Sequence, residues 1–426
     1  MRFFFPDSQD LVDPSFDFMD ETRDSLRIRH QDDLYAHEIF DSPPYDGLLV
    51  SKAIVDGKGG AGGRYTVAQR HRLMRRGGRE FFRLDPCRLL LMADCGAFSY
   101  VNEESPPFTV TEILDFYGTI GCDYGISVDH VILAYRPDWD TLFGLGEGAP
   151  PDARRRQELT LDLARAFLQG HAHGGYSFEP MGVAQGWSPA SYRRAVESLQ
   201  AMGFQYIALG GLVPLKTPEI LAVLEAVSEV RRPEVRLHLL GVTRPHNIPA
   251  FSAYGVASFD STSPLRQAFK DGKDNYYTSD RTFTAVRVPQ VDGNPRLQRD
   301  IQAGRIAQDR ARLLEGRCME SLRQYELDLC SVDRVLECLT EYEHLIDGKR
   351  DHSVAYRDVL TARPWRECSC AVCRALGYQV ILFRGAERNR RRGFHNLWVT
   401  YQRLRGTLAQ LPQPIDTVSV AQGPLS

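Results

Sequence analysis

The chain has 426 residues, of which 43% are hydrophobic and 25% are charged. This composition supports a large buried core and excludes a wholly disordered chain. The formal net charge is −3, so the chain as a whole has no excess of positive charge that would draw it to nucleic acid.

Residues 1–46 are rich in Asp, Pro and Phe and show little periodicity. We expect an N-terminal extension here. The apolar start, Met1 to Phe5, is shorter than the run that a secretory signal needs. The sequence contains no apolar stretch of the ~18 residues that a membrane-spanning helix requires. The nine cysteines are an odd number, which favours a reducing compartment, and we expect a cytoplasmic protein with no membrane partner.

Seven short apolar runs follow, and amphipathic segments separate them. The runs cover residues 47–53, 89–98, 124–132, 178–186, 206–211, 235–242 and 256–260, and helical spacing is clearest over 154–168, 188–202 and 217–230. Strands and helices in alternation predict a parallel sheet. A closed barrel and an open doubly wound sheet both fit, and we favour the barrel. Polar residues follow many of the runs, and a barrel gathers such strand ends on one face.

The chain therefore has the α/β fold class, and we expect the barrel to occupy residues 47–296. Residues 273–294 are polar and predict a loop. Residues 297–347 predict helices, and the part after 366 carries a cysteine cluster. We expect 297–426 to be a helical, zinc-binding region that completes the barrel.

The cysteine cluster is the strongest local motif. Cys368, Cys370 and Cys373 lie within six residues, and His395 follows at an expected helix start. Three thiolates and one imidazole suit the tetrahedral geometry of a structural zinc ion. His352 is the alternative fourth ligand, and three incidental cysteines are the alternative to a metal site.

Acidic residues end three of the apolar runs. Asp94, Asp129 and Asp260 each follow a short hydrophobic stretch. A carboxylate can act as a nucleophile at a sugar carbon, as a general acid or base, or as an acceptor for the N–H groups of a base. Any one of them could instead cap the helix that follows. Gln185 and the pair Gly210-Gly211 end two further runs.

Arginines gather in two places. Arg75 and Arg76 belong to a group spread over residues 64–88, and Arg388, Arg390, Arg391 and Arg392 belong to a second group over 384–392. Such clusters can pair with phosphates, and we expect these six residues to bind nucleic acid. A solvated surface is the alternative.

Taken in order, these segments resemble the tRNA-guanine transglycosylase family. The matching segments are Asp94-Cys95-Gly96-Ala97-Phe98, Ser127-Val128-Asp129, Val183-Ala184-Gln185-Gly186, Ala208-Leu209-Gly210-Gly211-Leu212, Leu239-Leu240-Gly241-Val242, Phe259-Asp260 and the Cys368, Cys370, Cys373 and His395 set. The resemblance implies a (β/α)8 barrel with a zinc-binding insertion near its end.

The resemblance also implies roles for single residues. Asp260 would attack C1′ of the nucleoside, and Asp94 would be the general acid/base. The base would be held by Asp129, Gln185, Gly210, Gly211 and Leu212, with Leu240 in the pocket wall. The incoming base would be a 7-deazaguanine.

Departures from the family pattern concern the polymer. Cys95, Ala97 and Ser99 replace residues usual in the tRNA enzymes, and Ser-Thr-Ser-Pro follows Asp260. The N-terminal sequence and Val50-Ser51-Lys52-Ala53 resemble the bacterial and phage DNA 7-deazaguanine transglycosylases. We therefore expect a bacterial or phage enzyme that inserts a 7-cyano-7-deazaguanine type of base into DNA, beside partner proteins. A tRNA-guanine or archaeosine-type transglycosylase and a non-catalytic accessory subunit are the alternatives.

Overall fold

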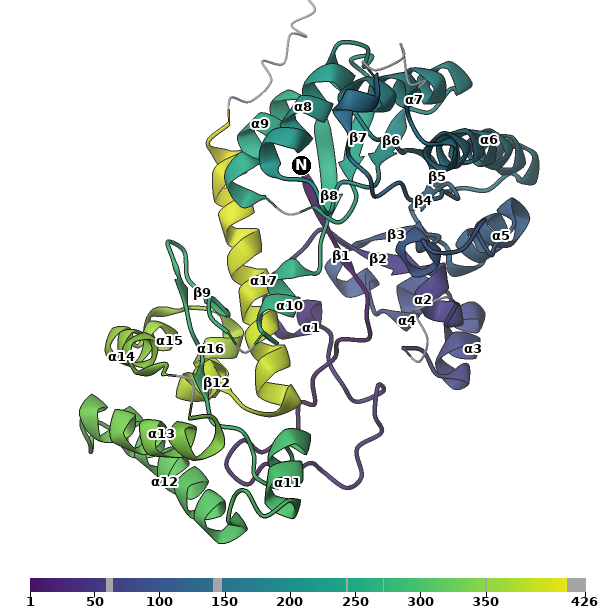
Figure 1. The fold of residues 1–426 in the computed structure, drawn as a ribbon. Helices are drawn as coiled ribbons and strands as arrows, with labels where there is room; N and C mark the ends of the chain where they lie inside the picture. The colour runs from purple at the N-terminus through teal and green to yellow at the C-terminus, as the bar shows by residue number, and fades with distance from the viewer. Residues whose placement is uncertain (59–63, 141–147, 243, 271, 349–350, 412–426) are drawn as a thin grey trace, which may run out of the picture.

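The computed structural model describes residues 1–58, 64–140, 148–242, 244–270, 272–348 and 351–411. Eight parallel strands close a barrel in chain order (Figure 1). They are β1 (Arg2–Pro6), β2 (Gly47–Ser51), β3 (Leu90–Asp94), β4 (Tyr124–Ile126), β5 (Glu179–Ala184), β6 (Tyr206–Leu209), β7 (Arg236–Leu239) and β8 (Val256–Asp260). The predicted barrel is confirmed, and each of the seven predicted runs contains one of its strands.

The eighth strand, β1, lies in the segment that we expected to be an extension outside the barrel, and that expectation was wrong. β1 pairs with β2 on one side and with β8 on the other, so it closes the barrel. Phe4 points into the barrel interior, whereas Phe3 and Phe5 pack outward under the helices. A strand buried on both faces reads as an unbroken apolar run, and this run is too short to stand out from the sequence.

Helices cover the outside of the barrel. They are α1 (Ala36–Ile39), α2 (Lys52–Asp56), α3 (Val67–Arg76), α4 (Gly78–Phe81), α5 (Val110–Ile120), α6 (Pro151–Gly174), α7 (Pro189–Met202), α8 (Thr217–Ser228), α9 (Ile248–Ala253) and α10 (Ser263–Gln267). The three predicted helices correspond to α6, α7 and α8. In α7, Ser188 accepts a hydrogen bond from the backbone N–H of Ser191 and Pro189 occupies the first turn, as the Ser-Pro pair predicts.

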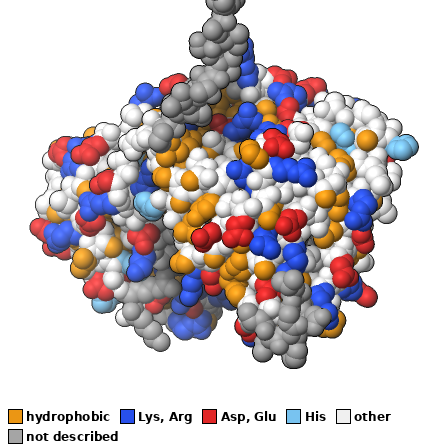
Figure 2. Space-filling model, turned by 90° about the horizontal axis from the view of Figure 1, so that it is seen from above, with side chains coloured by type: hydrophobic (Ala, Val, Ile, Leu, Met, Phe, Trp, Pro, Cys, Tyr) orange, Lys and Arg blue, Asp and Glu red, His pale blue; other side chains and the backbone are white. Residues whose placement is uncertain are grey.

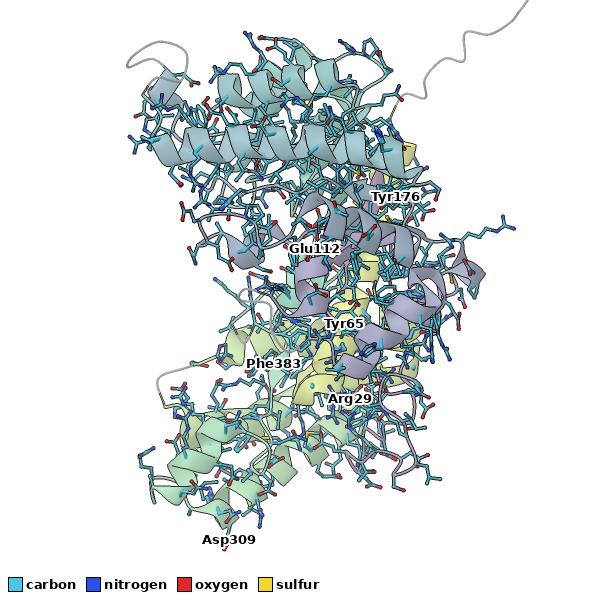
Figure 3. All side chains as sticks on the ribbon, turned by 90° about the vertical axis from the view of Figure 1, so that its right-hand side faces the viewer. Arg29, Tyr65, Glu112, Tyr176, Asp309 and Phe383 are labelled. Carbon is cyan, nitrogen blue, oxygen red and sulfur yellow. The ribbon has the colours of Figure 1, made fainter. Side chains whose placement is uncertain are left out.

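The C-terminal region is mainly helical. Its helices are α11 (Pro295–Gln302), α12 (Gln308–Glu326), α13 (Val332–Ile346), α14 (Ser353–Ala362), α15 (Pro364–Glu367), α16 (Ala371–Leu376) and α17 (Gly385–Ala409). Short strands β9 (Tyr276–Tyr277), β10 (Thr282–Phe283) and β11 (Val286–Arg287) interrupt the segment predicted to be a loop, and β12 (Leu382–Phe383) pairs with β11. Figure 3 shows Glu112 and Tyr176 on the barrel, with Asp309 of α12 at the far end of the molecule.

Helix α17 joins this region to the barrel (Figure 1). It packs against α10 and α9, the two helices that flank β8 in the chain. Trp398 of α17 stacks on Phe40, with ring centroids 6.4 Å apart. The hydroxyl of Tyr401 donates a 2.7 Å hydrogen bond to Asp46. These contacts place α17 against the outer helices of the barrel, whereas all eight barrel strands lie within residues 2–260.

The barrel interior is mostly apolar. Phe4, Leu49, Met92, Ile126 and Val183 belong to one buried cluster that fills it. Across the described residues, none of the helices is both long and apolar enough to cross a membrane. The face of the molecule seen in Figure 2 carries acidic and basic side chains interspersed with one another, in line with the small net charge.

Candidate active site and metal centre

The predicted site residues of the barrel lie at the carboxyl ends of its strands. Asp94 ends β3, Asp260 ends β8, and Asp129 follows β4 by three residues. Gln185 directly follows β5, and Gly210 directly follows β6. Because all eight strands are parallel in a closed barrel, these ends face one rim. The fold thus gathers groups that lie up to 166 positions apart in the sequence, from Asp94 to Asp260.

Asp129 is buried and held by two side chains. The Nε2 amide of Gln185 donates to Asp129 Oδ2 at 2.7 Å, and the Cys95 thiol donates to Asp129 Oδ1 at 3.2 Å. The hydroxyl of Tyr100 donates to the Cys95 sulfur at 3.0 Å and to the Asp129 carbonyl at 3.1 Å. Burial raises the pKa of Asp129 to about 6, while the hydrogen bonds from Cys95 and Gln185 oppose that rise. The carboxylate is fixed in place and ready to accept hydrogen bonds.

The two glycines after β6 are required by close packing. A Cβ atom at Gly210 would lie 2.2 Å from Nε2 of Gln185. Gly211 has a φ of +73°, and a Cβ atom there would lie 2.6 Å from the Ile132 carbonyl oxygen. Only glycine combines this backbone conformation with this space. Leu212 is fully buried behind the pair, and Leu240 is half-buried against the apolar interior of the barrel.

Asp94 has a buried oxygen, Oδ1, with no hydrogen-bond partner in the described part of the chain. The hydroxyl group of Ser51, which ends the neighbouring strand β2 and pairs with Asp94 in the sheet register, interacts with this carboxyl group. Burial raises the pKa of Asp94 to about 7; the Ser51 hydroxyl opposes this rise, and the negative charges of Asp260 and Asp129 add to it. A carboxyl group with this pKa can both donate and accept a proton near neutral pH.

Asp260 is 6% exposed and has a different environment. Its Oδ1 accepts a 2.9 Å hydrogen bond from the backbone N–H of Gly241, and Nε2 of His238 lies 3.2 Å from the same oxygen. Two nitrogen atoms within hydrogen-bond distance of one oxygen hold this carboxyl group in a fixed orientation. The pocket therefore holds one carboxyl group suited to proton transfer and one suited to attack on an electrophilic carbon.

Sequence reasoning missed His238, Ser51 and Tyr100, each of which contacts or adjoins a predicted site residue. For His238 a signal existed, since it interrupts the apolar run of β7 two positions before Leu240. Ser51 and Tyr100 carry no such signal, because serine at a strand end and tyrosine in a loop are common in any barrel.

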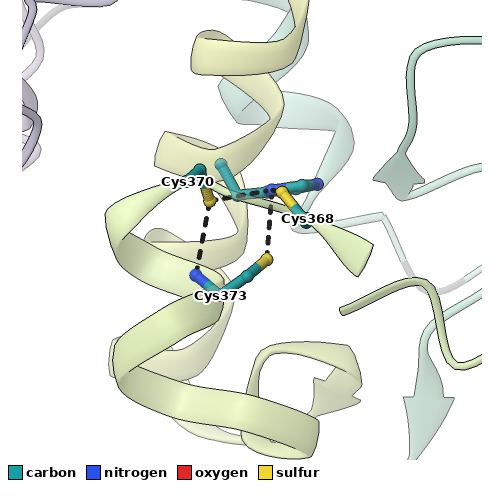
Figure 4. A group of neighbouring side chains, drawn as sticks. Cys368, Cys370 and Cys373 are labelled. Atoms are coloured by element: carbon teal, nitrogen blue, oxygen red, sulfur yellow. Dashed lines mark hydrogen bonds between the residues drawn. The ribbon is translucent and has the colours of Figure 1, made fainter. Parts of the chain in front are cut away.

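The C-terminal motif forms a compact cluster of metal-ligand atoms. The sulfurs of Cys368, Cys370 and Cys373 and a ring nitrogen of His395 all lie within 4.8 Å of one another. Nδ1 of His395 lies 3.7 Å from the sulfur of Cys368 and 3.4 Å from each of the other two sulfurs. Figure 4 shows the three cysteine side chains converging beside the first turn of α16. This group could hold a metal ion.

The histidine is oriented for such a role. Nε2 of His395 lies 2.7 Å from the backbone carbonyl of Tyr277, which fixes the ring proton on Nε2 and leaves the Nδ1 lone pair facing the sulfurs. The ring of Tyr276 stacks on the imidazole with centroids 4.3 Å apart. The alternative ligand, His352, lies outside the cluster, and its Nδ1 is 2.6 Å from Glu343. His395 is thus the histidine that the fold brings to the cysteines.

The second arginine group does not face solvent, and the expectation that it binds nucleic acid was wrong for Arg388, Arg391 and Arg392. All three are buried. Arg388 pairs with Glu21 and donates to the Phe18 carbonyl at 2.6 Å. Arg391 donates to the Asp13 carbonyl at 2.7 Å.

Arg392 donates to the carbonyls of Val380, Leu382 and Ala268. Arg390 is less buried, and it lies 3.8 Å from Asp10 and 3.9 Å from Glu387. These arginines tie residues 10–21 and the start of β12 to α17. Because a guanidinium has five N–H donors, it can serve several backbone carbonyls at once.

Arg75 and Arg76 of the first group are exposed, and Arg76 pairs with Glu80 at 3.1 Å. They end α3, and the next two residues approach the carbonyl of Ile120 at the end of α5. The end of α5 leads into the start of β4. This contact places both arginines toward the amino-terminal end of the barrel, away from the rim that carries Asp94 and Asp260.

Known proteins resemble this chain over different lengths. Residues 60–319 match the family described as queuine tRNA-ribosyltransferase. A Salmonella montevideo protein named DNA-guanine transglycosylase is 49% identical over 413 residues, which cover 96% of this chain and 98% of that protein. A queuine tRNA-ribosyltransferase of Xanthomonas campestris pv. campestris (strain B100) is 35% identical over 151 residues, which cover 35% of this chain and 37% of that protein.

Proposed function

The chain belongs to the queuine tRNA-ribosyltransferase family, and from this premise we propose that it is a DNA-guanine transglycosylase, a pentosyltransferase that exchanges guanine in DNA for a 7-deazaguanine base. The observation that carries the proposal is the 49% identity, over 96% of the chain, to a protein named for that activity. The pocket supports it, because two carboxyl groups with different environments meet at the barrel rim. The 7-cyano-7-deazaguanine type is the base that we propose to be inserted.

The exchange divides into two displacements at C1′ of the deoxyribose. Asp260 attacks C1′ through a carboxylate oxygen, the bond from C1′ to N9 of guanine breaks, and Asp94 gives its proton to the departing base. The incoming base then loses its N9 proton to Asp94, and N9 attacks C1′ and releases Asp260. The covalent ester retains the bond energy of the glycosidic link, so no nucleotide triphosphate is consumed by this step.

Recognition of the base falls to the groups around Asp129. Its carboxylate and the amide of Gln185 match the N–H and carbonyl edge of a guanine-like base. The glycines Gly210 and Gly211 let the base approach the backbone, and Leu212 and Leu240 supply apolar walls. A pocket of this kind accepts both guanine and a 7-deazaguanine, since the two share that edge.

We propose zinc as the metal of the C-terminal cluster. Three thiolates and one imidazole form a closed tetrahedral set, which suits a structural zinc ion and leaves no ligand position for water. When bound, zinc would cross-link the start of α16 to α17. Residues Cys368, Cys370, Cys373 and His395 would hold it, at a distance from the chemistry.

DNA as substrate requires that guanine leave the duplex, at a cost of a few kcal/mol. Phosphate contacts beside the pocket can offset this cost. Helix α10 begins three residues after Asp260; Arg266 in this helix and Lys270, three residues beyond its end, are exposed. We propose these two cations for that role, in place of the buried arginines of α17. DNA in a bacterial or phage-infected cell implies a cytoplasmic enzyme, and partner proteins of a DNA-modification system fit the same setting.

The test is incorporation of a labelled 7-deazaguanine into DNA or tRNA. Both polymers are supplied at equal nucleotide concentration in one buffer, to the wild type and to Asp260→Asn. We expect label in DNA with the wild type and none with Asp260→Asn. Label in tRNA alone would establish the tRNA activity that the family description favours, and no label in either polymer would support an accessory role. Activity of Asp260→Asn would remove the nucleophile assignment.

A further inference from the structure

A string of buried polar side chains crosses the apolar interior of the barrel and ends at Asp260. Nε2 of His238 lies 3.2 Å from Asp260 Oδ1, and Nδ1 lies 2.6 Å from Oγ of Ser258. The Ser258 hydroxyl is hydrogen-bonded in turn to the hydroxyl of Tyr206. His238 and Ser258 are fully buried, and the edge of the imidazole meets the ring of Phe4. Apolar residues could fill this space without the cost of burying polar atoms. Packing of the barrel interior therefore does not explain why these polar side chains are present.

The hydrogens of this string have one consistent direction. Oδ1 of Asp260 already accepts from the N–H of Gly241 and can only accept again, so Nε2 of His238 carries a proton. In the neutral ring, Nδ1 is then an acceptor and the Ser258 hydroxyl donates to it. The oxygen of Ser258 is left to accept from Tyr206. Each group in the string thereby has a hydrogen-bond partner.

We propose that His238 is a positioning residue that holds Asp260 as an oriented carboxylate, with Ser258 and Tyr206 fixing the imidazole tautomer. This inference rests on the proposed function, in which Asp260 is the nucleophile. Two N–H donors fix Oδ1, whereas Oδ2 has no hydrogen-bond partner in the part of the chain that the structure describes. Oδ2 is accordingly the oxygen that meets C1′.

Charged and titratable groups lie at both ends of the string. On the pocket side, Asp94 and Asp129 are the titratable neighbours. At the other end, Arg236 lies over the ring of Tyr206, with its guanidinium carbon 4.4 Å from the centroid, and Arg2 donates to the hydroxyl of Tyr124. Burial raises the pKa of Tyr206 to about 12, so its hydroxyl remains a donor at physiological pH.

The hydrogen-bonded string gives the carboxyl groups of Asp260 and Asp94 different environments and therefore different roles. Oδ1 of Asp260 is held by the N–H of Gly241 and by His238, whereas Asp94 has a buried oxygen without a partner in the described part of the chain and a raised pKa. Loss of the His238 donor should make Asp260 harder to ionise. The covalent step should then slow, while the affinity for the incoming base, which depends on Asp129 and Gln185, should remain.

The experiment measures the rate at which a covalent protein–DNA adduct forms across pH, with labelled guanine-containing DNA and no incoming base. The variants are His238→Leu, His238→Gln and Ser258→Ala. We expect His238→Leu to slow adduct formation about tenfold to a hundredfold, which is the range for loss of a hydrogen bond to a charged group. We also expect the acid side of the pH–rate profile of His238→Leu to move to higher pH. His238→Gln should recover part of the wild-type rate and part of the wild-type pH profile, because its amide can donate in place of the imidazole N–H. Ser258→Ala should lie between the wild type and His238→Leu.

His37→Leu is the matched control. His37 is also buried with two hydrogen bonds, to Tyr45 and to the Phe82 carbonyl, but it lies outside the barrel interior. The His37→Leu variant should have a lower melting temperature than the wild type, and the acid side of its pH–rate profile should not move. The inference would be overturned if His238→Leu formed the adduct at the wild-type rate and with the wild-type pH profile. It would also be overturned if His37→Leu shifted the acid side of the pH–rate profile as much as His238→Leu does. If the wild type forms no adduct, or if Asp260→Asn forms one, the proposed function itself is contradicted, and the inference about His238 no longer applies.

Discussion

Nε2 of Gln185 donates a 2.7 Å hydrogen bond to Oδ2 of Asp129, and this bond joins the ends of two neighbouring barrel strands. Gly210 lies against the same amide. Gln185→Ala should raise KM for the incoming base by about tenfold to a hundredfold, because the carboxylate loses a hydrogen bond that orients it.

Gly210→Ala should have a similar effect, since its Cβ would lie 2.2 Å from the Gln185 amide nitrogen. Gly316→Ala in α12, where an added Cβ meets nothing within 4 Å, is the control and should leave KM unchanged. Steady-state kinetics with a labelled base measure all three. If KM is unchanged in both Gln185→Ala and Gly210→Ala, then these two residues do not contribute to binding of the base.

Asp94 gives a pH dependence to both activity and stability. Its pKa is raised to about 7, so its proton-donating form declines as pH rises through 7, and the rate of guanine release should decline with it. Asp94→Asn should lose this transition and about 10²–10⁴-fold in rate. Near-normal turnover with the wild-type pH profile in Asp94→Asn would assign proton transfer to another group.

The stability effect of Asp94 has a definite sign. A carboxyl group whose pKa is higher in the folded than in the unfolded chain contributes stability below its unfolded pKa of about 4 and loses it as pH rises toward 7. Asp94→Asn removes this loss. We therefore expect the variant to melt at a higher temperature than the wild type at pH 8, and to differ little at pH 4. A lower melting temperature at pH 8 would contradict the assigned shift.

The cysteine cluster should bind one metal ion per chain, as a closed structural site does. Elemental analysis of gently purified protein should identify it as zinc. Cys370→Ala should reduce the metal content and lower the melting temperature, because the ligands then no longer link α16 to α17. Cys330→Ala is the control, as Cys330 lies outside the cluster. Protein with full stability and no metal would refute the site.

The buried arginines of α17 should contribute to stability and not to DNA binding. Arg392→Ala leaves the carbonyls of Val380, Leu382 and Ala268 without this donor. Loss of so many partners should cost roughly 3 kcal/mol or more of unfolding free energy. Urea denaturation measures the cost. If the variant instead keeps its stability and weakens DNA binding, the guanidinium must reach DNA.

Arg266 of α10 and Lys270, which follows this helix, should determine the salt dependence of DNA binding. Arg266→Ala combined with Lys270→Ala should weaken binding and reduce the slope of log K against log salt by about 0.9 for each phosphate that the variant no longer neutralises. Arg75→Ala combined with Arg76→Ala removes the same charge at the other end of the barrel and is the matched control. An equal slope change in both pairs would mean that the charge acts nonspecifically. Fluorescence anisotropy with duplex DNA at several salt concentrations gives the slopes.

The sequence by itself determined the fold class, the seven runs that become β2 to β8 and the residues placed at their ends. This was possible because strand periodicity, helix caps and strand-end polar residues are local properties of a chain. Three cysteines in six positions are equally local, so the cysteine cluster could be predicted, whereas the choice of His395 over His352 depends on the fold.

Only the tertiary structure decided what depends on the neighbours of a residue. Arg388 and Arg392 look like surface cations in the sequence, but Glu21 and distant carbonyls satisfy them in the interior. β1 is recognisable only from its pairing with β8 across the closed barrel. His238 gains its meaning from Asp260, which lies 22 residues away in the chain and one strand away in space. Burial and hydrogen-bond partners arise from chain closure, and no local pattern encodes them.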